Sequence, residues 1–184
     1  MFRSHAPPGY DCPFCRVVRG EDLSGMFSRQ SDVVLRTPLA TAFVCARWWP
    51  GNPGHLLVVP NAHVENLYAL QAPLLGHVHE VVRRVALALR EAYPCEGVST
   101  RQHNEPASHQ EVWHFHCHVF PRYAGDGLYE RSSEYRWTTP EERAPYAEKL
   151  RVWLTQHPAE GVSTASGVAK ASVVCDVGGS KASY

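Results

Sequence analysis

Three histidines separated by single residues constrain this chain more than any other feature of its sequence. His114, His116 and His118 lie in the segment 110–122, and each is followed by an apolar residue. Side chains on an extended strand alternate between its two faces. The spacing therefore predicts a strand with three imidazoles on one face and a core-facing row on the other: Phe115, Cys117 and Val119. Three imidazoles in register on a half-buried strand indicate a site.

A row of imidazoles supports two kinds of chemistry. One ring can attack an electrophile while its second nitrogen is held by a hydrogen bond, because the two ring nitrogens can have different tasks. A His-x-His pair can instead hold a catalytic metal ion. A histidine-rich strand without any function is the third interpretation, and three imidazoles in alternation disfavour it.

The residues around the histidines separate these interpretations. Gln110 stands four residues before the first of them, and Pro121 and Arg122 follow the last. Upstream, residues 53–63 contain Pro-Gly-His, an apolar run and a second histidine after Pro-x-x, and residues 12–21 contain Cys-x-x-Cys and Gly-Glu. These three blocks cover residues 10–125 and resemble the histidine-triad (HIT) family, in particular its bacterial zinc-containing type with Cys-x-x-Cys.

The resemblance implies a catalytic mechanism. His116 matches the nucleophile, which attacks the α-phosphorus of a nucleoside 5′-phosphate derivative and forms a nucleotidyl-histidine. The backbone carbonyl of His114 is expected to fix the tautomer of this ring, while His118 and Gln110 contact phosphate oxygens and the leaving group. His55, in the Pro-Gly-His block, is expected to support the triad. The implied activity is hydrolysis of a nucleoside phosphoramidate, an adenylylated conjugate or a dinucleoside polyphosphate.

Three alternatives stay open at this point. A dinucleoside polyphosphate phosphorylase would use the same chemistry with phosphate, not water, as the acceptor. A metal-dependent hydrolase would use the triad itself as zinc ligands. A nucleotide-binding protein would bind its ligand without turnover.

A second motif predicts a metal site. Cys12 and Cys15 have the spacing of metal ligands, and two thiolates need two further ligands to close a tetrahedral zinc site. A redox Cys-x-x-Cys normally belongs to a βαβ unit, and the sequence predicts none here. In similar bacterial members, the positions of His63 and His114 complete the ligand set. The resemblance therefore implies structural Zn²⁺ bound by these four residues and connected to the catalytic strand through His114.

Two places depart from the family pattern. Where relatives carry an Asp that binds ribose hydroxyls, this chain has Arg47, whose guanidinium can only donate hydrogen bonds. Trp48 and Trp49 follow, and either ring can stack on a base. In the loop before the triad, His103 stands where many members have Asn, with Asn104 beside it as a substitute phosphate contact, and the Gly before the glutamine is missing. We expect contacts with a specialised substrate from Arg47, Trp48, His103 and Asn104.

The remaining pattern predicts an α+β, HIT-like domain. Short apolar segments bounded by turns predict strands at 33–36, 41–45, 55–59, 97–102 and 112–120, which form an antiparallel sheet of about five strands. Apolar residues at helical spacing predict one long helix over 73–93, which Pro94 ends. A short helix is expected over 64–70. A C-terminal helix begins after a capping box at Thr139 and ends before Pro158.

Composition and charge set limits on location and partners. The 18 basic and 18 acidic residues balance, so nothing draws the chain to nucleic acid or to an anionic membrane. No apolar run reaches membrane-spanning length, and the six cysteines do not form the dense framework of a secreted domain. We expect a flexible leader at 1–9, a HIT-like domain at 10–158 and a disordered tail at 159–184. The protein is expected to be cytoplasmic and, from the resemblance, a homodimer.

Overall fold

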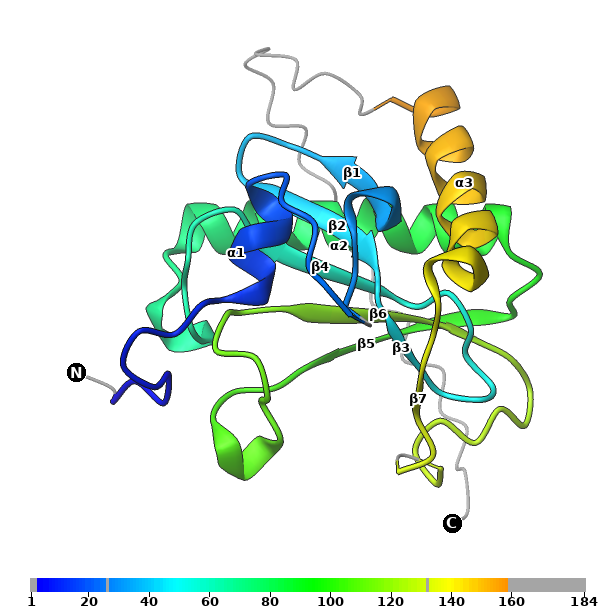
Figure 1. The fold of residues 1–184 in the computed structure, drawn as a ribbon. Coiled ribbons are helices and arrows are strands. Elements are labelled where there is room, and N and C mark those ends of the chain that lie inside the picture. The colour runs from blue at the N-terminus through cyan, green and yellow to red at the C-terminus, as the bar shows by residue number, and fades with distance from the viewer. Residues whose placement is uncertain (1–2, 26, 132, 159–184) are drawn as a thin grey trace, which may run out of the picture.

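An antiparallel five-stranded sheet forms the centre of the protein (Figure 1). The computed structural model describes residues 3–25, 27–131 and 133–158. The strand order is β1-β2-β4-β6-β5, and every neighbouring pair is antiparallel. The strands are β1 (Val33–Arg36), β2 (Ala40–Val44), β4 (Leu56–Pro60), β5 (Gly97–Gln102) and β6 (Cys117–Arg122). The predicted α+β fold and its five-stranded sheet are confirmed.

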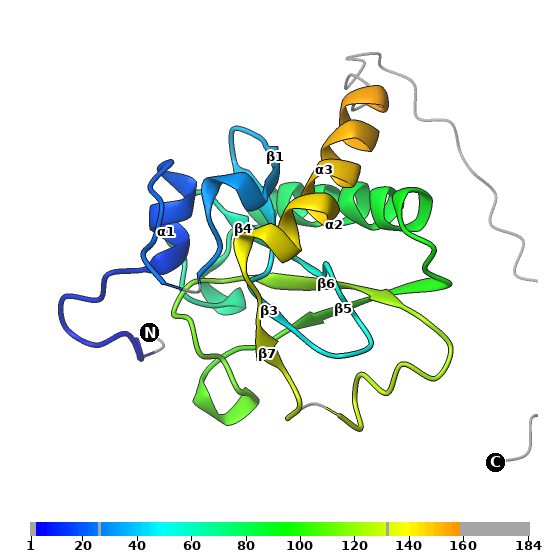
Figure 2. The same ribbon diagram turned by 45° about the vertical axis from the view of Figure 1, so that its right-hand side comes forward.

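Helices cover both faces of this sheet. The long helix α2 (Ala72–Ala92) packs across β2, β4, β5 and β6, and α3 (Pro140–Gln156) lies against α2 and β1. The short helix α1 (Pro13–Val18) lies on the opposite face (Figures 1 and 2). A second, two-stranded sheet joins β3 (Arg47–Trp48) to β7 (Arg136–Trp137).

Side-chain alternation along β4 explains why both faces are covered. Leu56 and Val58 belong to the main core under α2, whereas Leu57 and Val59 pack on Val17 of α1. All of these side chains are at least 95% buried. Each buried aliphatic side chain contributes about 1.5–3 kcal/mol to stability. A strand that is apolar on both faces therefore needs a helix on each side.

The same alternation continues on β6 and separates the core from the site. Cys117 and Val119 lie in the main core. His118 and Phe120 point to the other face, and Arg101 of β5 is the direct cross-strand partner of His118. Residues directly opposite in a ladder share a face of the sheet. The α1 face of β5 and β6 thus carries polar and aromatic groups where the α2 face carries a core.

The predicted strand 112–120 is only partly confirmed. The strand begins at Cys117, because the backbone before it leaves the ladder and Phe115 N–H donates to the carbonyl of Val64 at 2.6 Å. The alternation of side chains survives this break, since Phe115 is buried in the main core. The predicted short helix 64–70 is reduced to a 3₁₀ turn, Leu67–Ala69.

The two long helices form where the sequence predicts them. The helix α2 has Pro73 in its first turn and ends at Ala92, and α3 begins at Pro140. Thr139 Oγ1 accepts from Glu142 N–H and the Glu142 carboxylate accepts from Thr139 N–H, so the expected capping box is present. The helix α1 and the β3–β7 pair were not expected, because each is too short to show a period.

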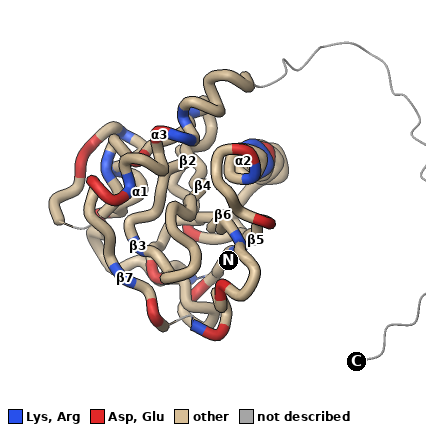
Figure 3. Tube along the Cα trace, turned by 90° about the vertical axis from the view of Figure 1, so that its right-hand side faces the viewer, with Lys and Arg blue, Asp and Glu red and all other residues tan. Residues whose placement is uncertain are grey.

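Acidic and basic residues are interspersed along the described chain, in keeping with its balanced charge (Figure 3). Neither of the long helices described is apolar enough to cross a membrane.

The predicted tail, 159–184, lies outside the described residues. Near the start of the chain, Ser4 and His5 both donate to the carboxylate of Glu65. The expected domain boundaries and the homodimer stay predictions.

A buried ion pair connects α3 to the start of β1. Arg143 and Asp32 are both fully buried, and their Nε–Oδ1 distance is 2.9 Å. We expect Asp32→Ala to lower the free energy of unfolding by about 3–5 kcal/mol, because it leaves a buried guanidinium without its carboxylate. Urea denaturation measures this difference. Glu134→Ala, which breaks the exposed pair with Arg131, is the control, and an equal effect in both variants would contradict the prediction.

Candidate functional site

A pocket of about 620 Å³ opens on the α1 face of the sheet. His116 and His118 form part of its wall, together with Arg101 from β5. Phe14 and Val17 contribute the α1 side, and β3, β7 and the loop after β5 complete the lining. The three elements that the sequence analysis did not predict, α1, β3 and β7, are therefore elements that build the pocket.

The geometry of His116 fixes its tautomer. Its Nδ1 lies 2.8 Å from the backbone carbonyl oxygen of His114. A carbonyl can only accept, so Nδ1 carries the hydrogen and Nε2 keeps its lone pair. The ring lines the pocket and Phe14 meets it edge-on, with 5.2 Å between the ring centroids. The arrangement leaves one nucleophilic nitrogen on a ring that cannot easily turn.

His118 and His55 form a stacked pair, with His118 on the wall of the pocket and His55 behind it. His118 Nδ1 lies 3.4 Å from Nε2 of His55, and the two rings are stacked at 5.5 Å. His55 also stacks on Phe120 at 4.4 Å and is fully buried. His118 lines the pocket but His55 does not. His55 therefore contacts His118 from behind, and its expected support of the triad stays a prediction.

Burial keeps these imidazoles neutral. It lowers the pKa of His116 to about 4 and that of His55 to about 3, and it lowers the pKa of His118 well below its usual value. The cause in each case is loss of hydration by the charged form. At neutral pH, His116 is thus a free base whose Nε2 lone pair is available.

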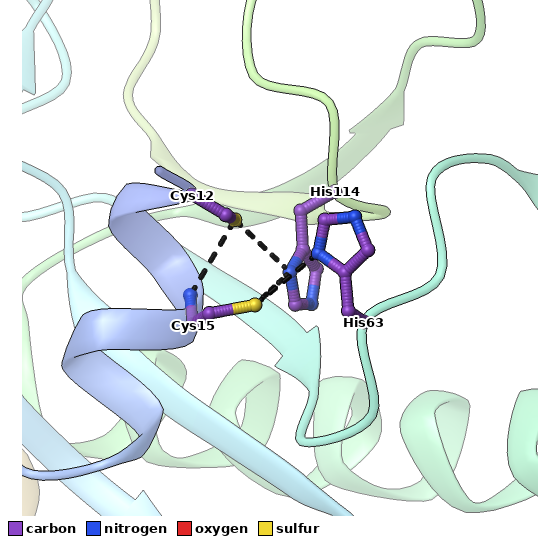
Figure 4. A group of neighbouring side chains, drawn as sticks. All are labelled: Cys12, Cys15, His63 and His114. Carbon is purple, nitrogen blue, oxygen red and sulfur yellow. Dashed lines mark hydrogen bonds between the residues drawn. The ribbon is translucent and has the colours of Figure 1, made fainter. Parts of the chain in front are cut away.

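Two cysteines and two histidines form a compact cluster beside the pocket (Figure 4). Their ligand atoms all lie within 4.8 Å of one another: Cys12, Cys15, His63 and His114. Nδ1 of His114 is 3.4 Å from Sγ of Cys12 and 3.5 Å from Sγ of Cys15, and Nδ1 of His63 is 3.2 Å from Cys15. Tetrahedral zinc with these ligands needs separations of roughly 3.3–3.8 Å. The four residues that the resemblance implies can hold a metal ion.

The tautomer of His114 fits metal binding. Its Nε2 donates to the carbonyl of Pro60 at 2.9 Å, so its Nδ1 is unprotonated and faces the two sulfur atoms. A metal-bound histidine commonly donates its other N–H to such an acceptor. Burial raises the pKa of the Cys12 thiol to about 12. A thiolate at this position therefore needs a cation next to it.

Gln110 and Asn104 hold the loop between β5 and β6. The Gln110 amide donates to the carbonyls of Glu65 and Val112 and accepts from Glu105 N–H. Asn104 accepts from Leu67 N–H and exchanges hydrogen bonds with a neighbouring amide side chain. Neither side chain is part of the pocket lining. In this conformation both amides fix the loop, and their contact with phosphate stays a prediction.

The same loop has an unusual backbone. Glu105 and His109 both have φ of +65°, a region that L-residues seldom adopt. His109 is in the left-handed helical region, which explains why a glycine suits this position, just before the glutamine. Its imidazole and that of His103 line the pocket. The backbone here holds two imidazoles toward the pocket at some cost in strain.

The two tryptophans after Arg47 have different places. Trp48 is buried, donates to the carbonyl of Cys45 and packs on Tyr146, away from the pocket. Trp49 lines the pocket and lies edge-on to His55. Arg47 lines it too, with its guanidinium 4.3 Å from the ring centre of Tyr135. Of the two tryptophans only Trp49 lines the pocket; its exposed fraction is 5%, like that of Trp48, and stacking on a base stays a prediction.

Several pocket residues could not be identified from the sequence as members of the site. Phe14 was hidden in the Cys-x-x-Cys block. Trp137 reaches the pocket from β7, which pairs with β3 across nearly 90 residues of sequence, and Tyr135 reaches it from the position just before β7. Arg47 is far in the sequence from Tyr135 and Trp137, so the three residues form no recognisable motif. Only the β3–β7 pairing shows that they meet.

Comparison with known proteins places the chain in a family. The α+β fold, the geometry of the histidines and the adjacent Cys₂His₂ cluster together define a class of protein. The family model of the HIT domain matches residues 27–125. The chain therefore belongs to the HIT family. Protein hit of Bacillus subtilis is 29% identical over 119 residues, which is 64% of this chain and 76% of that protein. The Saccharomyces cerevisiae adenosine 5′-monophosphoramidase HNT1 is 26% identical over 111 residues, 60% of this chain and 62% of HNT1.

Solved structures share the fold. A zinc-bound histidine triad family protein from Mycobacterium smegmatis aligns with a TM-score of 0.64 at 27% identity. The alignment covers 79% of this chain and 94% of that one. The expected membership of the family is thus confirmed by sequence and by structure.

The buried His55 makes stability depend on pH. Its pKa is about 3 in the folded chain against 6.5 in the unfolded chain, so the unfolded chain alone binds this proton between those values. The contribution of His55 is complete above pH 6.5, and stability is lost as pH falls, by about 2 kcal/mol at pH 5. Urea denaturation from pH 5 to 7.5 should show this slope reduced in His55→Phe. His79→Gln, at an exposed position, should keep the slope, and an unchanged slope in His55→Phe would contradict the assignment.

Proposed function

We propose that this protein is a nucleotide hydrolase that cleaves at the α-phosphate of a nucleoside conjugate through a nucleotidyl-His116 intermediate. The observation that carries the proposal is the hydrogen bond from His116 Nδ1 to the carbonyl of His114. It leaves Nε2 unprotonated on a ring that lines a pocket large enough for a nucleotide. Burial keeps that nitrogen from being protonated at neutral pH.

The reaction has two steps. In the first, the Nε2 lone pair of His116 forms a bond to the α-phosphorus while the bond from phosphorus to the leaving nitrogen or oxygen breaks, and the leaving group takes a proton from solvent. In the second, a water oxygen attacks the same phosphorus and releases a proton to solvent, the N–P bond breaks and the ring returns to its neutral form. His118 and Arg101 share the wall with His116 and supply donors to the phosphate oxygens.

Among the relatives, the name of HNT1 identifies an adenosine 5′-monophosphoramidase. This supports a phosphoramidate or another adenylylated conjugate as the substrate. A dinucleoside polyphosphate fits the same chemistry. Phosphate in place of water as acceptor would make the protein a phosphorylase, and the acceptor stays a prediction. Binding without turnover is the remaining alternative, and the prepared lone pair of His116 disfavours it.

The geometry disfavours a catalytic metal held by the triad. His114 Nδ1 faces the two cysteines, whereas His116 Nδ1 is bonded to a carbonyl and His118 Nδ1 faces His55. Both nitrogens of His114 are engaged, Nδ1 toward the cysteines and Nε2 with the carbonyl of Pro60, so His114 cannot join His116 and His118 on a shared ion. We infer instead that Cys12, Cys15, His63 and His114 bind structural Zn²⁺. The ion would fix the His114 backbone, whose carbonyl holds the nucleophile.

Replacing the nucleophile tests the proposed activity. His116→Asn should lower hydrolysis of adenosine 5′-phosphoramidate by about 10³-fold or more, because asparagine cannot form the covalent intermediate. Rapid quenching and intact-mass measurement should detect a nucleotidyl adduct on the unchanged protein and none on the variant. His79→Gln is the matched control for loss of an imidazole. Undiminished hydrolysis by His116→Asn would overturn the assignment.

Metal content tests the cluster. Purified protein should contain zinc in equimolar amount, and Cys15→Ser should lose it and melt at a lower temperature, because a structural ion contributes directly to folding. Elemental analysis and thermal unfolding measure both effects. Cys95→Ala, in the main core, should keep its zinc. Zinc retained by Cys15→Ser would argue against the site, and activity lost on chelation before any loss of stability would favour a catalytic metal.

A further inference from the structure

The charges that line the pocket do not balance. Arg47 and Arg101 contribute two positive groups, and Glu111 is the single carboxylate among the described lining residues. The pocket therefore carries more positive charge than its own acidic group compensates, and it favours an anionic ligand.

Arg101 lies on the wall of the triad. It is the cross-strand partner of His118, and its guanidinium is 5.1 Å from the ring centre of Trp49 and 5.0 Å from that of Phe120. No carboxylate pairs with it among the residues that the structure describes. In the proposed function, a phosphate attacked by His116 would lie against the wall that carries this cation. Binding of the reacting phosphate thus gives Arg101 a role in the pocket.

Arg47 reaches the pocket from a different element, β3. The central carbon of its guanidinium lies over the Tyr135 ring, 4.3 Å from the ring centre, and 5.9 Å from the ring centre of Trp137. Nη1 contacts the Glu111 carboxylate at 2.6 Å. A guanidinium has five N–H donors in its plane. Donors remain on the edge of Arg47 for a second acceptor.

The pair formed by Arg47 and Glu111 can be exchanged at low cost. The Glu111 side chain is 58% exposed, and an ion pair in such a position contributes little to stability. A phosphate brings more charge and matches the fork of the guanidinium better than one exposed carboxylate oxygen does. Glu111 is therefore a weak competitor for an anion that enters the pocket.

We infer that the substrate carries a second anionic group besides the phosphate that reacts, and that Arg47 binds this group as a specificity-determining residue. The inference rests on the proposed function, which assigns the first phosphate to His116. The second group is a phosphate or a carboxylate. It can belong to the ribose, as a 2′- or 3′-phosphate, or to the part of the substrate that leaves.

Nucleotide binding measured by calorimetry tests this inference without turnover. The ligands are AMP, adenosine 2′,5′-bisphosphate and 3′,5′-bisphosphate, and ADP, whose extra phosphate is on the leaving side. The unchanged protein should bind at least one doubly phosphorylated ligand about 10-fold or more tightly than AMP. Arg47→Gln should remove this preference, so that doubly phosphorylated ligands bind no more tightly than AMP, whereas Arg101→Gln should weaken every ligand. The preferred ligand identifies the position of the second group.

Glu111→Gln provides the opposite test. Removal of the competing carboxylate should increase affinity for the preferred doubly charged ligand several-fold. If the pair of Arg47 and Glu111 were purely structural, Arg47→Gln and Glu111→Gln would both lower the melting temperature, and neither would change the preference for a doubly charged ligand. That result would overturn the inference. Arg83→Gln, which breaks an exposed pair with Glu80 outside the pocket, is the charge-matched control.

The outcomes also separate this inference from the proposed function. Equal affinity for AMP and all doubly charged ligands would overturn the role of Arg47 alone. An equal loss of AMP and bisphosphate binding in Arg47→Gln would do the same. Failure of the unchanged protein to bind any nucleotide would overturn both proposals.

Discussion

One hydrogen bond, from Nδ1 of His116 to the carbonyl of His114, is the constraint on which the site depends. It fixes the ring, its tautomer and the direction of the Nε2 lone pair. The carbonyl can hold this position because His114 itself is held at both nitrogens. Its Nε2 donates to Pro60, and its Nδ1 faces the cysteine pair. The nucleophile is thus positioned by backbone that two further contacts keep in place.

The fold supplies these contacts from distant parts of the chain. Pro60 ends the strand that pairs with β6, Cys12 caps the short helix α1, and His63 follows β4 closely. A packed sheet with helices on both faces brings them within a few ångströms, because apolar alternation on β4 directs one set of side chains to α2 and the other to α1. The metal-binding cluster and the pocket share this second face.

The pocket has a different character on its two sides. The triad side is made of neutral imidazoles and one half-buried arginine, which suit a phosphate under attack. The β3–β7 side is aromatic and exposed, and it carries Arg47 at the position where the family resemblance leads us to expect an acidic residue that binds ribose. Replacing an acceptor by a donor changes what can bind there, since hydroxyl hydrogens no longer find a carboxylate. We therefore expect substrate preference in this protein to differ from that of relatives with the usual acidic residue.

Sequence alone determined the fold class, the five strands and both long helices, because periodicity, proline positions and a capping box are local signals. It also determined the family and the four residues of the cluster, since short motifs with fixed spacing carry them. Tertiary structure alone decided where Gln110, Asn104 and Trp48 point, and it showed the strand break before Cys117. It also brought β7 to β3 and so placed Tyr135 and Trp137 beside Arg47. These features depend on pairing between segments far apart in the chain, for which a single sequence contains no local signal.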